Sequence, residues 1–245
     1  MEQFLGNVKL TVTGIIVVAV ALLLAVASCK GNGKDADDPV DESQLLFYEA
    51  YTNAEVGDAF VNMLTTAQAD GDSVVIQYYM GEYESRPVVY HTEGDTTVVN
   101  NIVSKYGQNF LPDDIKLFWY VKQEYDFDMS SGSMVVTDTV NINYLYALKG
   151  MPRITAKAVA SAKIESDPDI GDEYIRLVFT EQGAKQLSEM TTENLDRAIG
   201  VVYKGKLLCC PTIIEPINDG TLVFPNRLSP EETKQLLEQV NGQTN

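Results

Sequence analysis

Few side chains of this sequence combine the types and spacing that catalysis requires. His91 is the only histidine among 245 residues, and it falls in a strand-like run beside Tyr90, so a cluster of histidine ligands around a metal ion is excluded. A serine or cysteine nucleophile needs a base held beside it, and His91 is the only histidine on offer. The sequence also lacks the Gly-x-x-x-x-Gly-Lys-Ser/Thr loop that cradles phosphates. We therefore expect a protein that is not an enzyme and that binds no cofactor.

Two acidic pairs and one tryptophan are the remaining candidates for ligand binding. Asp113–Asp114 and Asp126/Asp128 offer the oxygen ligands that calcium prefers. The second pair lacks the further acids of an EF-hand loop, and a solvated loop explains both pairs without an ion. Trp119 stands between two other aromatic residues in KLFWYVKQEY, which is typical of a core strand; an aromatic ledge for a ligand is the alternative. We expect no metal site at either pair.

The cysteines provide no disulfide framework. Beyond Cys29 the sequence holds only Cys209 and Cys210, which are adjacent. They form either a strained vicinal disulfide or reactive thiol pair, or simply two small buried strand residues, which is the interpretation we favour.

Cys29 lies at the end of an apolar leader segment. Lys9 precedes the run from Leu10 to Ala27, which carries no charge and ends in small residues, the layout of a secretory signal. Val26-Ala27-Ser28-Cys29 resembles the lipobox of bacterial lipoproteins, in which the cysteine becomes the acylated first residue. On this resemblance residues 1–28 are a lipoprotein signal peptide, and a fatty acyl group such as palmitate on Cys29 anchors the protein in a membrane. The alternatives are an uncleaved membrane helix, because the run approaches the roughly 20 residues that a bilayer needs, or a plain signal with an incidental cysteine.

The stretch after Cys29 is acidic, and so is the whole chain. Residues 29–43 hold five acids, glycine and almost nothing apolar, so we expect a flexible tether. This tether loosely resembles the export signal of Bacteroidetes surface lipoproteins. Lys30 stands where inner-membrane lipoproteins commonly have aspartate, which favours the outer membrane. The net charge of −17 argues against a nucleic-acid partner, since lysine and arginine supply most of the affinity for phosphates.

Strand and helix patterns alternate beyond the tether. Val56, Phe60, Met63 and Ala67 recur at helical spacing after a capping Thr52 or Asn53. Four runs read as strands, two of them around a turn at Gly81-Glu82: 73–80, 87–91, 115–122 and 134–148. A helix follows Asp95 and should end at Gly107.

The final third of the chain gives the clearest pattern of strands and helices. Residues 174–179 read as a strand before a helix capped by Thr180, and 199–203 and 207–210 form a hairpin across Lys204-Gly205. Ser229-Pro230-Glu231-Glu232 is a capping box that opens a last helix. The expected fold is α+β, with layered mixed or antiparallel sheets and amphipathic helices.

The same region resembles a known family. Residues 174–240, "YIRLVFTEQGAKQLSEMTTENLDRAIGVVYKGKLLCCPTIIEPINDGTLVFPNRLSPEETKQLLEQV", look like the first large periplasmic domain of the SecD and SecDF protein-export subunits. The upstream segments LLFYEAYTNAEVGDAF, LPDDIKLFWYVK and LYALKG are similar to segments that Bacteroidetes SecDF chains carry in this order. The positions that match the family are Phe179, Gly183, Thr191, Asn194, Pro211, Ile217 and Gly220.

The resemblance implies a SecD-like N-terminal subdomain over residues 44–150 and a head-like subdomain with a C-terminal helix over 151–245. Most shared residues have structural reasons: Gly183 permits close helix approach, Gly220 suits a turn, and Pro211 ends a strand. Lys204 stands where the family commonly has aspartate, and Cys209-Cys210 replaces a serine-alanine pair. No apolar run of membrane-spanning length follows residue 29, so we do not expect the proton-driven work that the resemblance assigns to membrane helices.

These observations favour a lipid-anchored, stand-alone binding or accessory module outside the cytoplasm. By resemblance it would contact unfolded exported polypeptide or components of the Sec translocon. The alternative is an envelope or surface lipoprotein that reuses the fold for a structural or ligand-binding role unrelated to secretion, because a fold does not fix a function.

Overall fold

The computed structural model describes residues 40–72, 77–78, 89–92, 96–128, 135–166 and 172–242. Cys29 and most of the acidic tether lie outside these residues, so the predicted anchor stays a prediction. The elements in chain order are β1 (Leu45–Glu49), α1 (Asn53–Ala69), β2 (Gln77–Tyr78), β3 (Val89–Thr92), α2 (Thr97–Phe110), β4 (Lys116–Asp128), β5 (Val135–Leu148), β6 (Ile154–Thr155), the 3-10 turn η1 (Ala156–Ala158), β7 (Val159–Ser166), β8 (Glu173–Phe179), α3 (Glu181–Glu193), β9 (Ile199–Tyr203), β10 (Lys206–Cys209), β11 (Thr221–Pro225) and α4 (Pro230–Gly242).

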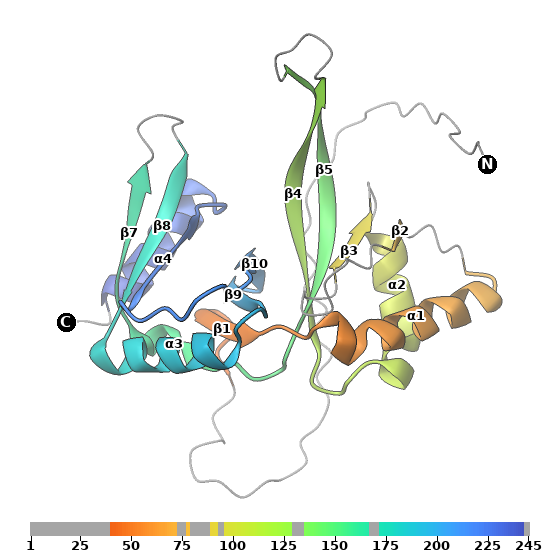
Figure 1. Ribbon diagram of the computed structural model, residues 1–245, viewed down its shortest axis with the longest axis horizontal. Coiled ribbons are helices and arrows are strands. Elements are labelled where there is room, and N and C mark those ends of the chain that lie inside the picture. Colours follow the sequence, from red (N-terminus) through yellow and green to blue (C-terminus); the bar gives the residue numbers. More distant parts are fainter. Residues whose placement is uncertain are drawn as a thin grey trace, which may run out of the picture.

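The strands form three sheets, in which every pairing between these strands is antiparallel. The head sheet has the order β11-β8-β7, the central sheet β10-β9-β1-β6, and the hairpin sheet β2-β3-β5-β4. Figure 1 shows the β4–β5 hairpin standing between the head elements β7, β8, α3 and α4 on one side and α1 and α2 on the other. The predicted α+β class with antiparallel sheets is confirmed.

Local sequence signals explain where the helices begin. The Thr52 hydroxyl accepts a hydrogen bond from the Glu55 N–H at 3.3 Å, and the Glu55 carboxylate accepts one from the Thr52 N–H at 2.8 Å, which forms a capping box on α1. Ser229 and Glu232 make the same reciprocal pair on α4. On α3 the hydroxyl of Thr180 accepts from the N–H of Gly183. The predicted starts of these three helices are therefore confirmed.

One predicted helix end is wrong. α2 continues past Gly107 to Phe110, and the N–H of Leu111 donates to the carbonyl of Gly107 at 2.8 Å. Gly107 is buried in the face that α2 turns toward the core, where a side chain would contact Val103 and Leu111 at 3.5 Å. A methyl group there would make ordinary van der Waals contacts, so this position is compatible with a continuing helix. Asp95, the expected cap, lies outside the described residues.

The main core lies between the head sheet, the central sheet and two helices. Large side chains from β1, β8 and β9 meet those of α3 and α4 there, with Phe47, Ile175, Leu187 and Leu236 all fully buried. Burial of apolar side chains of this size contributes roughly 1.5–3 kcal/mol each. Because α4 packs on β7 and belongs to this core, the C-terminal helix is an integral part of the head.

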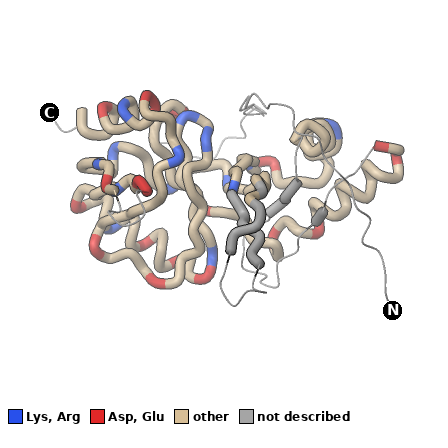
Figure 2. Tube along the Cα trace, turned by 90° about the horizontal axis from the view of Figure 1, so that it is seen from above, with Lys and Arg blue, Asp and Glu red and all other residues tan. Residues whose placement is uncertain are grey.

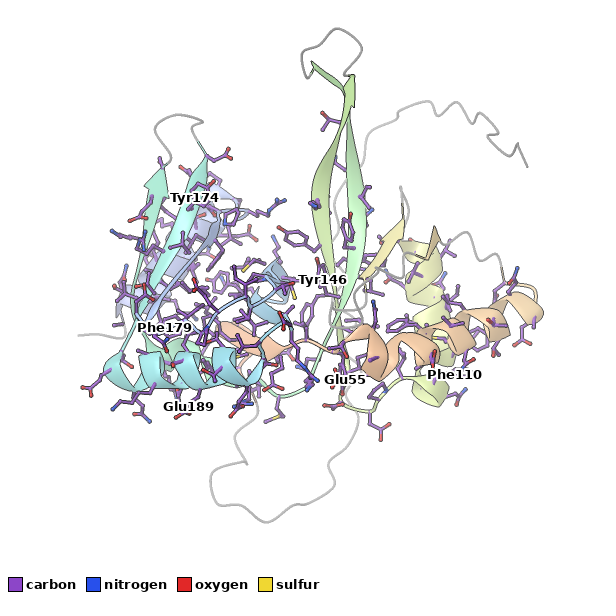
Figure 3. All side chains as sticks on the ribbon, in the orientation of Figure 1. Glu55, Phe110, Tyr146, Tyr174, Phe179 and Glu189 are labelled. Carbon is purple, nitrogen blue, oxygen red and sulfur yellow. The ribbon has the colours of Figure 1, made fainter. Side chains whose placement is uncertain are left out.

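Two smaller cores attach the hairpin sheet. One lies between α1, α2 and one face of the sheet, where Phe60, Ile102 and Leu145 are buried. The other joins the second face of the central sheet to the base of the hairpin, where the rings of Tyr48 and Phe118 lie 6.4 Å apart. In Figure 3 Tyr146 lies at this base, close to the central sheet.

The first strand, β1, lies in a sheet with strands from the later half of the chain. β1 pairs with β9 from Leu45↔Tyr203 to Glu49↔Ile199 and with β6 on its other side. The division of the chain near residue 150 stays a prediction, and any such division leaves β1 in a sheet with strands from the later half.

Candidate functional site: sheet edges around the head and hairpin

The residues that match the SecD pattern gather around α3. Gly183 faces η1 so closely that an added Cβ atom would lie 2.1 Å from the carbonyl oxygen of Ala158. Gly220 has a φ of +66°, and a Cβ atom there would lie 2.8 Å from the Cβ of Ala184. Both glycines therefore allow α3 to approach neighbouring backbone, as expected for Gly183 from the sequence.

Three further matching residues hold the end of α3 and the loop beside it. The buried Thr191 hydroxyl donates to the carbonyl of Leu187 and accepts from the N–H of Ile217 at 2.9 Å. The buried Asn194 side chain donates to the carbonyl of Met190 at 2.8 Å. These polar residues satisfy backbone groups that burial would otherwise leave without partners.

The last two matching residues are also structural. The ring of Phe179 packs in the main core, 5.4 Å from that of Phe47. Pro211 follows β10, and its carbonyl accepts a hydrogen bond from the N–H of Ile199. These contacts are structural, so the matching set stabilises the head.

Both edges of the head sheet carry groups that occupy or remove some of the outward backbone donors. On β7 the side chain of Asn241 accepts a hydrogen bond from the N–H of Ala162 at 2.9 Å and donates to the carbonyl of Ala162 at 3.1 Å, which imitates a neighbouring strand. On β11 the outward N–H of Thr221 donates to the carboxylate of Asp219 at 3.0 Å, and Pro225 has no N–H. Such devices protect sheets against pairing with another chain.

The outer edge of β4 differs from those two edges. β4 is the last strand of the hairpin sheet, and the base of this strand lies beside β10. At Val121 the outward carbonyl accepts a hydrogen bond from the guanidinium of Arg227 at 3.0 Å. The same guanidinium lies 4.9 Å from the ring centre of Tyr120. Arg227 therefore covers the edge at its base, and no strand of the described residues pairs with the edge beyond it.

The outer face of the head sheet is partly apolar. Val178 on β8 and Val223 on β11 are 38% and 41% exposed. Glu165 on β7 lies 2.8 Å from both Lys163 and Arg176, so the other half of this face is an ionic ladder. Figure 3 shows Tyr174 on β8 far from α3, toward the opposite end of the sheet.

An ionic network joins the two halves of the molecule. The carboxylate of Glu49, 14% exposed, accepts hydrogen bonds from Lys149 and Arg153. Arg153 also reaches Glu193 on α3, at 2.9 Å. Burial alone would raise the pKa of Glu49, yet the hydrogen bond from Lys149 and the charges of Lys149 and Arg153 bring this pKa below its ordinary value.

The same network continues to α1. Glu55, in its first turn, lies 3.7 Å from Lys149 and 3.4 Å from Arg197. In Figure 3 Glu55 lies between the end of α3 and the start of α1. The acids of the network are thus balanced by bases drawn from both halves, which fixes the junction without a bound ion.

The adjacent cysteines point into different cores. Cys209 is buried in the main core, whereas Cys210 packs against the core at the base of the hairpin. Both are free thiols, and burial raises the pKa of each. Cys209 ends β10 and Cys210 follows it, so the two thiols are held in the packing of separate cores and form no disulfide.

Two of the other candidates named from the sequence, Trp119 and Asp114, make contacts within the fold. Trp119 packs against the core beside α1 and α2, and its indole N–H donates to the side chain of Asn100 at 2.9 Å. Asp114 accepts a hydrogen bond from the hydroxyl of Tyr51. His91 pairs with Tyr144 in the β3–β5 ladder, and its side chain lies outside the described part, as do those of Asp126 and Asp128.

Neither a cluster of metal ligands nor a membrane-spanning helix is present in the part of the chain that the structure describes. No group of three or more potential metal ligands comes together there. None of the helices seen there has the length and apolar composition needed to cross a bilayer.

One hollow lies at the start of α3. It measures about 290 Å³ and is lined by residues that include Arg153, Lys157 and Gln182. Arg153 is held by Glu49 and Glu193, so its charge is already neutralised.

Charge is unevenly distributed along the chain. Residues 40–150 contain 17 acidic and 5 basic side chains, whereas residues 151–245 contain 14 and 10. Figure 2 shows both signs over the head and mostly acidic residues over α1 and α2. The region around the hairpin therefore favours cationic over anionic partners.

Comparison with known proteins finds relatives of part of the chain. Residues 133–242 match the family model "SecDF, P1 head subdomain". The chain is 32% identical over 87 residues to the SecD subunit of Dictyoglomus turgidum, covering 36% of this chain and 22% of that subunit. It is 30% identical over 87 residues to SecDF of Thermus thermophilus, covering 36% of this chain and 12% of that protein. A solved structure of SecDF, a membrane component that enhances protein export, aligns with a TM-score of 0.35 at 18% identity, over 80% of this chain and 92% of that one.

The matched segments span about a fifth or less of the length of these curated relatives. The likeness thus concerns one domain of larger translocase subunits. Residues 133–242, with the head sheet, α3 and α4, are thus similar to the P1 head subdomain of SecDF.

Proposed function

We propose that this protein is an accessory module of the cell envelope that contacts exported polypeptide, or components of the Sec translocon, while an acyl group on Cys29 holds it at a membrane. The observation that carries the proposal is the match of residues 133–242 to the P1 head subdomain. Curated relatives that share this region are protein translocase subunits.

The described geometry supports binding by surface contact. The residues that match the family stabilise α3 and its neighbours. Among the described residues, Val178 and Val223 stay exposed on the outer face of the head sheet, and no strand pairs with β4 beyond Val121. Extended polypeptide is recognised in two general ways, by apolar patches for side chains and by sheet edges for backbone groups. Both kinds of surface are present here.

Photo-crosslinking in cells tests the contact. A photoreactive amino acid at Val178, on the outer face of the head sheet, should label exported polypeptide or translocon subunits. The matched control is Lys185 on α3, which is 71% exposed and lies away from that face. Labelling equal to that at Lys185, with no export component recovered, would contradict the proposal.

The predicted attachment to a membrane is tested separately. We expect Cys29→Ser to release the protein from the membrane fraction, and mass spectrometry of the native protein to find an acylated residue 29 at the amino terminus. Digestion of the domain by protease added to intact cells would favour the alternative of a surface lipoprotein without a link to secretion.

A further inference from the structure

The hydrogen-bonding pattern of β4 shows which of its backbone groups point outward. The N–H and C=O of one strand residue point to the same side, and successive residues alternate. The carbonyl of Val121 points away from β5, because it accepts from Arg227. Residues 123 and 125 therefore also present their backbone groups to the outer edge, up to the register shift between Asp126 and Phe127.

In the described residues, the outer half of the hairpin is a ladder between β4 and β5. β3 pairs with β5 from Val89↔Tyr146 to Thr92↔Asn143, and the described strand that pairs with residues 135–142 is β4. A two-stranded ribbon is marginally stable by itself, and a third strand would stabilise it.

Other sheet edges in the described residues cannot serve in the same way. The β7 edge is covered by Asn241, and the β11 edge is interrupted by Asp219 and Pro225. β2 and β6 are two residues long, and β10 lies against the base of β4.

Charge selects among possible occupants of the β4 edge. Residues 122–142 contain Glu124, Asp126, Asp128 and Asp138 but only one basic residue, Lys122. A second copy of this ribbon would bring like charges together, which destabilises a sheet. A strand that carries lysine or arginine would be attracted instead.

We propose that the edge of β4 beyond Val121 binds one extended, basic segment of polypeptide as an added strand, with backbone groups at residues 123 and 125 as its hydrogen-bonding partners. This inference rests on the proposed function, since it names the segment of an exported polypeptide that the module takes. Few hydrogen bonds are involved, so we expect a dissociation constant on the order of 0.1–1 mM for a short peptide.

Proline substitution tests the edge directly. Gln123→Pro removes an outward N–H without breaking the ladder to β5, whereas Gln123→Ala keeps it. The probe is a fluorescent nine-residue peptide of alternating lysine and valine, measured by anisotropy with the full mature chain. We expect about tenfold weaker binding to the proline variant and unchanged binding to the alanine variant. Thermal unfolding of both variants checks that they fold.

A charge-reversed peptide, with glutamate for lysine, sharpens the result. It should bind at least about tenfold more weakly than the lysine peptide at low salt, and the difference should shrink as salt is added. Equal binding of both peptides, or equal binding to the folded proline and alanine variants, would overturn the inference.

Crosslinking separates this inference from the proposed function. A photoreactive residue at position 123 should label exported polypeptide in cells. Labelling from position 178 but not from 123 would refute the β4 site and leave the proposed function standing. Absence of labelling from both positions would remove the proposed function as well.

Discussion

The head sheet and the hairpin sheet treat their edges in opposite ways. The head sheet ends on one side at β7, where Asn241 occupies the backbone groups of Ala162, and on the other at β11, where Asp219 and Pro225 reduce the free donors. The hairpin sheet ends at β4, a strand of 13 residues covered at its base by Arg227.

The difference teaches where the molecule can admit another chain. A sheet edge pairs with any extended strand unless something blocks it, and most proteins block long edges. The head therefore offers a face but no edge, while the hairpin offers an edge. Backbone is also closely packed in the head, since an added Cβ at Gly183 would collide with the Ala158 carbonyl.

The largest expected effect comes from crowding the head. In Gly183→Ala the new methyl group meets the carbonyl oxygen of Ala158, so we expect a loss of about 3 kcal/mol in the free energy of unfolding, at the upper end for overpacking. Urea denaturation measures it. Gly242→Ala is the matched control, because no atom lies within 4 Å of the new Cβ. Equal stabilities of the two variants would show that the head is not closely packed at α3.

Next comes the junction between the two regions. Glu49→Gln keeps the shape of the side chain but removes the charge that pairs with Lys149 and Arg153, and we expect a loss of about 2 kcal/mol. Glu181→Gln, which breaks an exposed pair with Lys185, should cost less than about 0.5 kcal/mol. Hydrogen exchange should quicken on both sides of the junction in the first variant. If protection from hydrogen exchange were lost on only one side of the junction, the network would not couple the two halves.

Opening an edge of the head is a smaller change. Asn241→Ala removes two hydrogen bonds to Ala162 and should cost about 1 kcal/mol. It should also let the lysine–valine peptide, or a second copy, pair with β7, which ultracentrifugation and anisotropy detect. Glu238→Ala on the same helix, 67% exposed, should change neither property. An Asn241 variant that stays monomeric and gains no peptide binding would weaken the contrast between the two sheets.

The smallest expected effect is on the stability of the protein at low pH. The hydrogen bond from Lys206 lowers the pKa of Glu232 to about 2, against its ordinary value of 4.5. Since the folded protein holds this carboxylate ionised, its contribution is present above pH 4.5 and is lost as the pH falls from there toward 2. After screening by solvent we expect about 1 kcal/mol. The stability of Glu232→Gln should therefore fall less between pH 5 and pH 2.5; parallel curves for both proteins would refute this.

Much of the fold follows from local patterns. The capping boxes at Thr52 and Ser229 set helix starts through contacts within four residues, and the tight turn at Lys204-Gly205 shows the positive φ angles of 48° and 73° that the sequence suggests. The end of α2 was not predictable in this way. Gly107 reads as a stop signal, yet packing against the core carries the helix onward to Phe110.

The candidate site depended less on local pattern. Glycines at positions 183 and 220 could be identified as places of close approach, but the sequence does not say which backbone approaches them. Arg227 and Asn241 carried no signal at all, because an arginine in a loop or an asparagine at a helix end is ordinary on a surface. Their partners, Val121 and Ala162, lie 106 and 79 residues away.

The sequence by itself determined the α+β class, most helix starts and the β9–β10 hairpin, since these depend on periodicity, capping and spacing along the chain. It also carries the resemblance to SecD, which rests on matching residues in the same order. Only the tertiary structure decided which strands lie at sheet edges, which edges are covered, and that Cys209 and Cys210 enter different cores. The physical reason is that an edge is defined by the absence or presence of a distant partner, and pairing across a hundred residues leaves no mark on the neighbours in sequence.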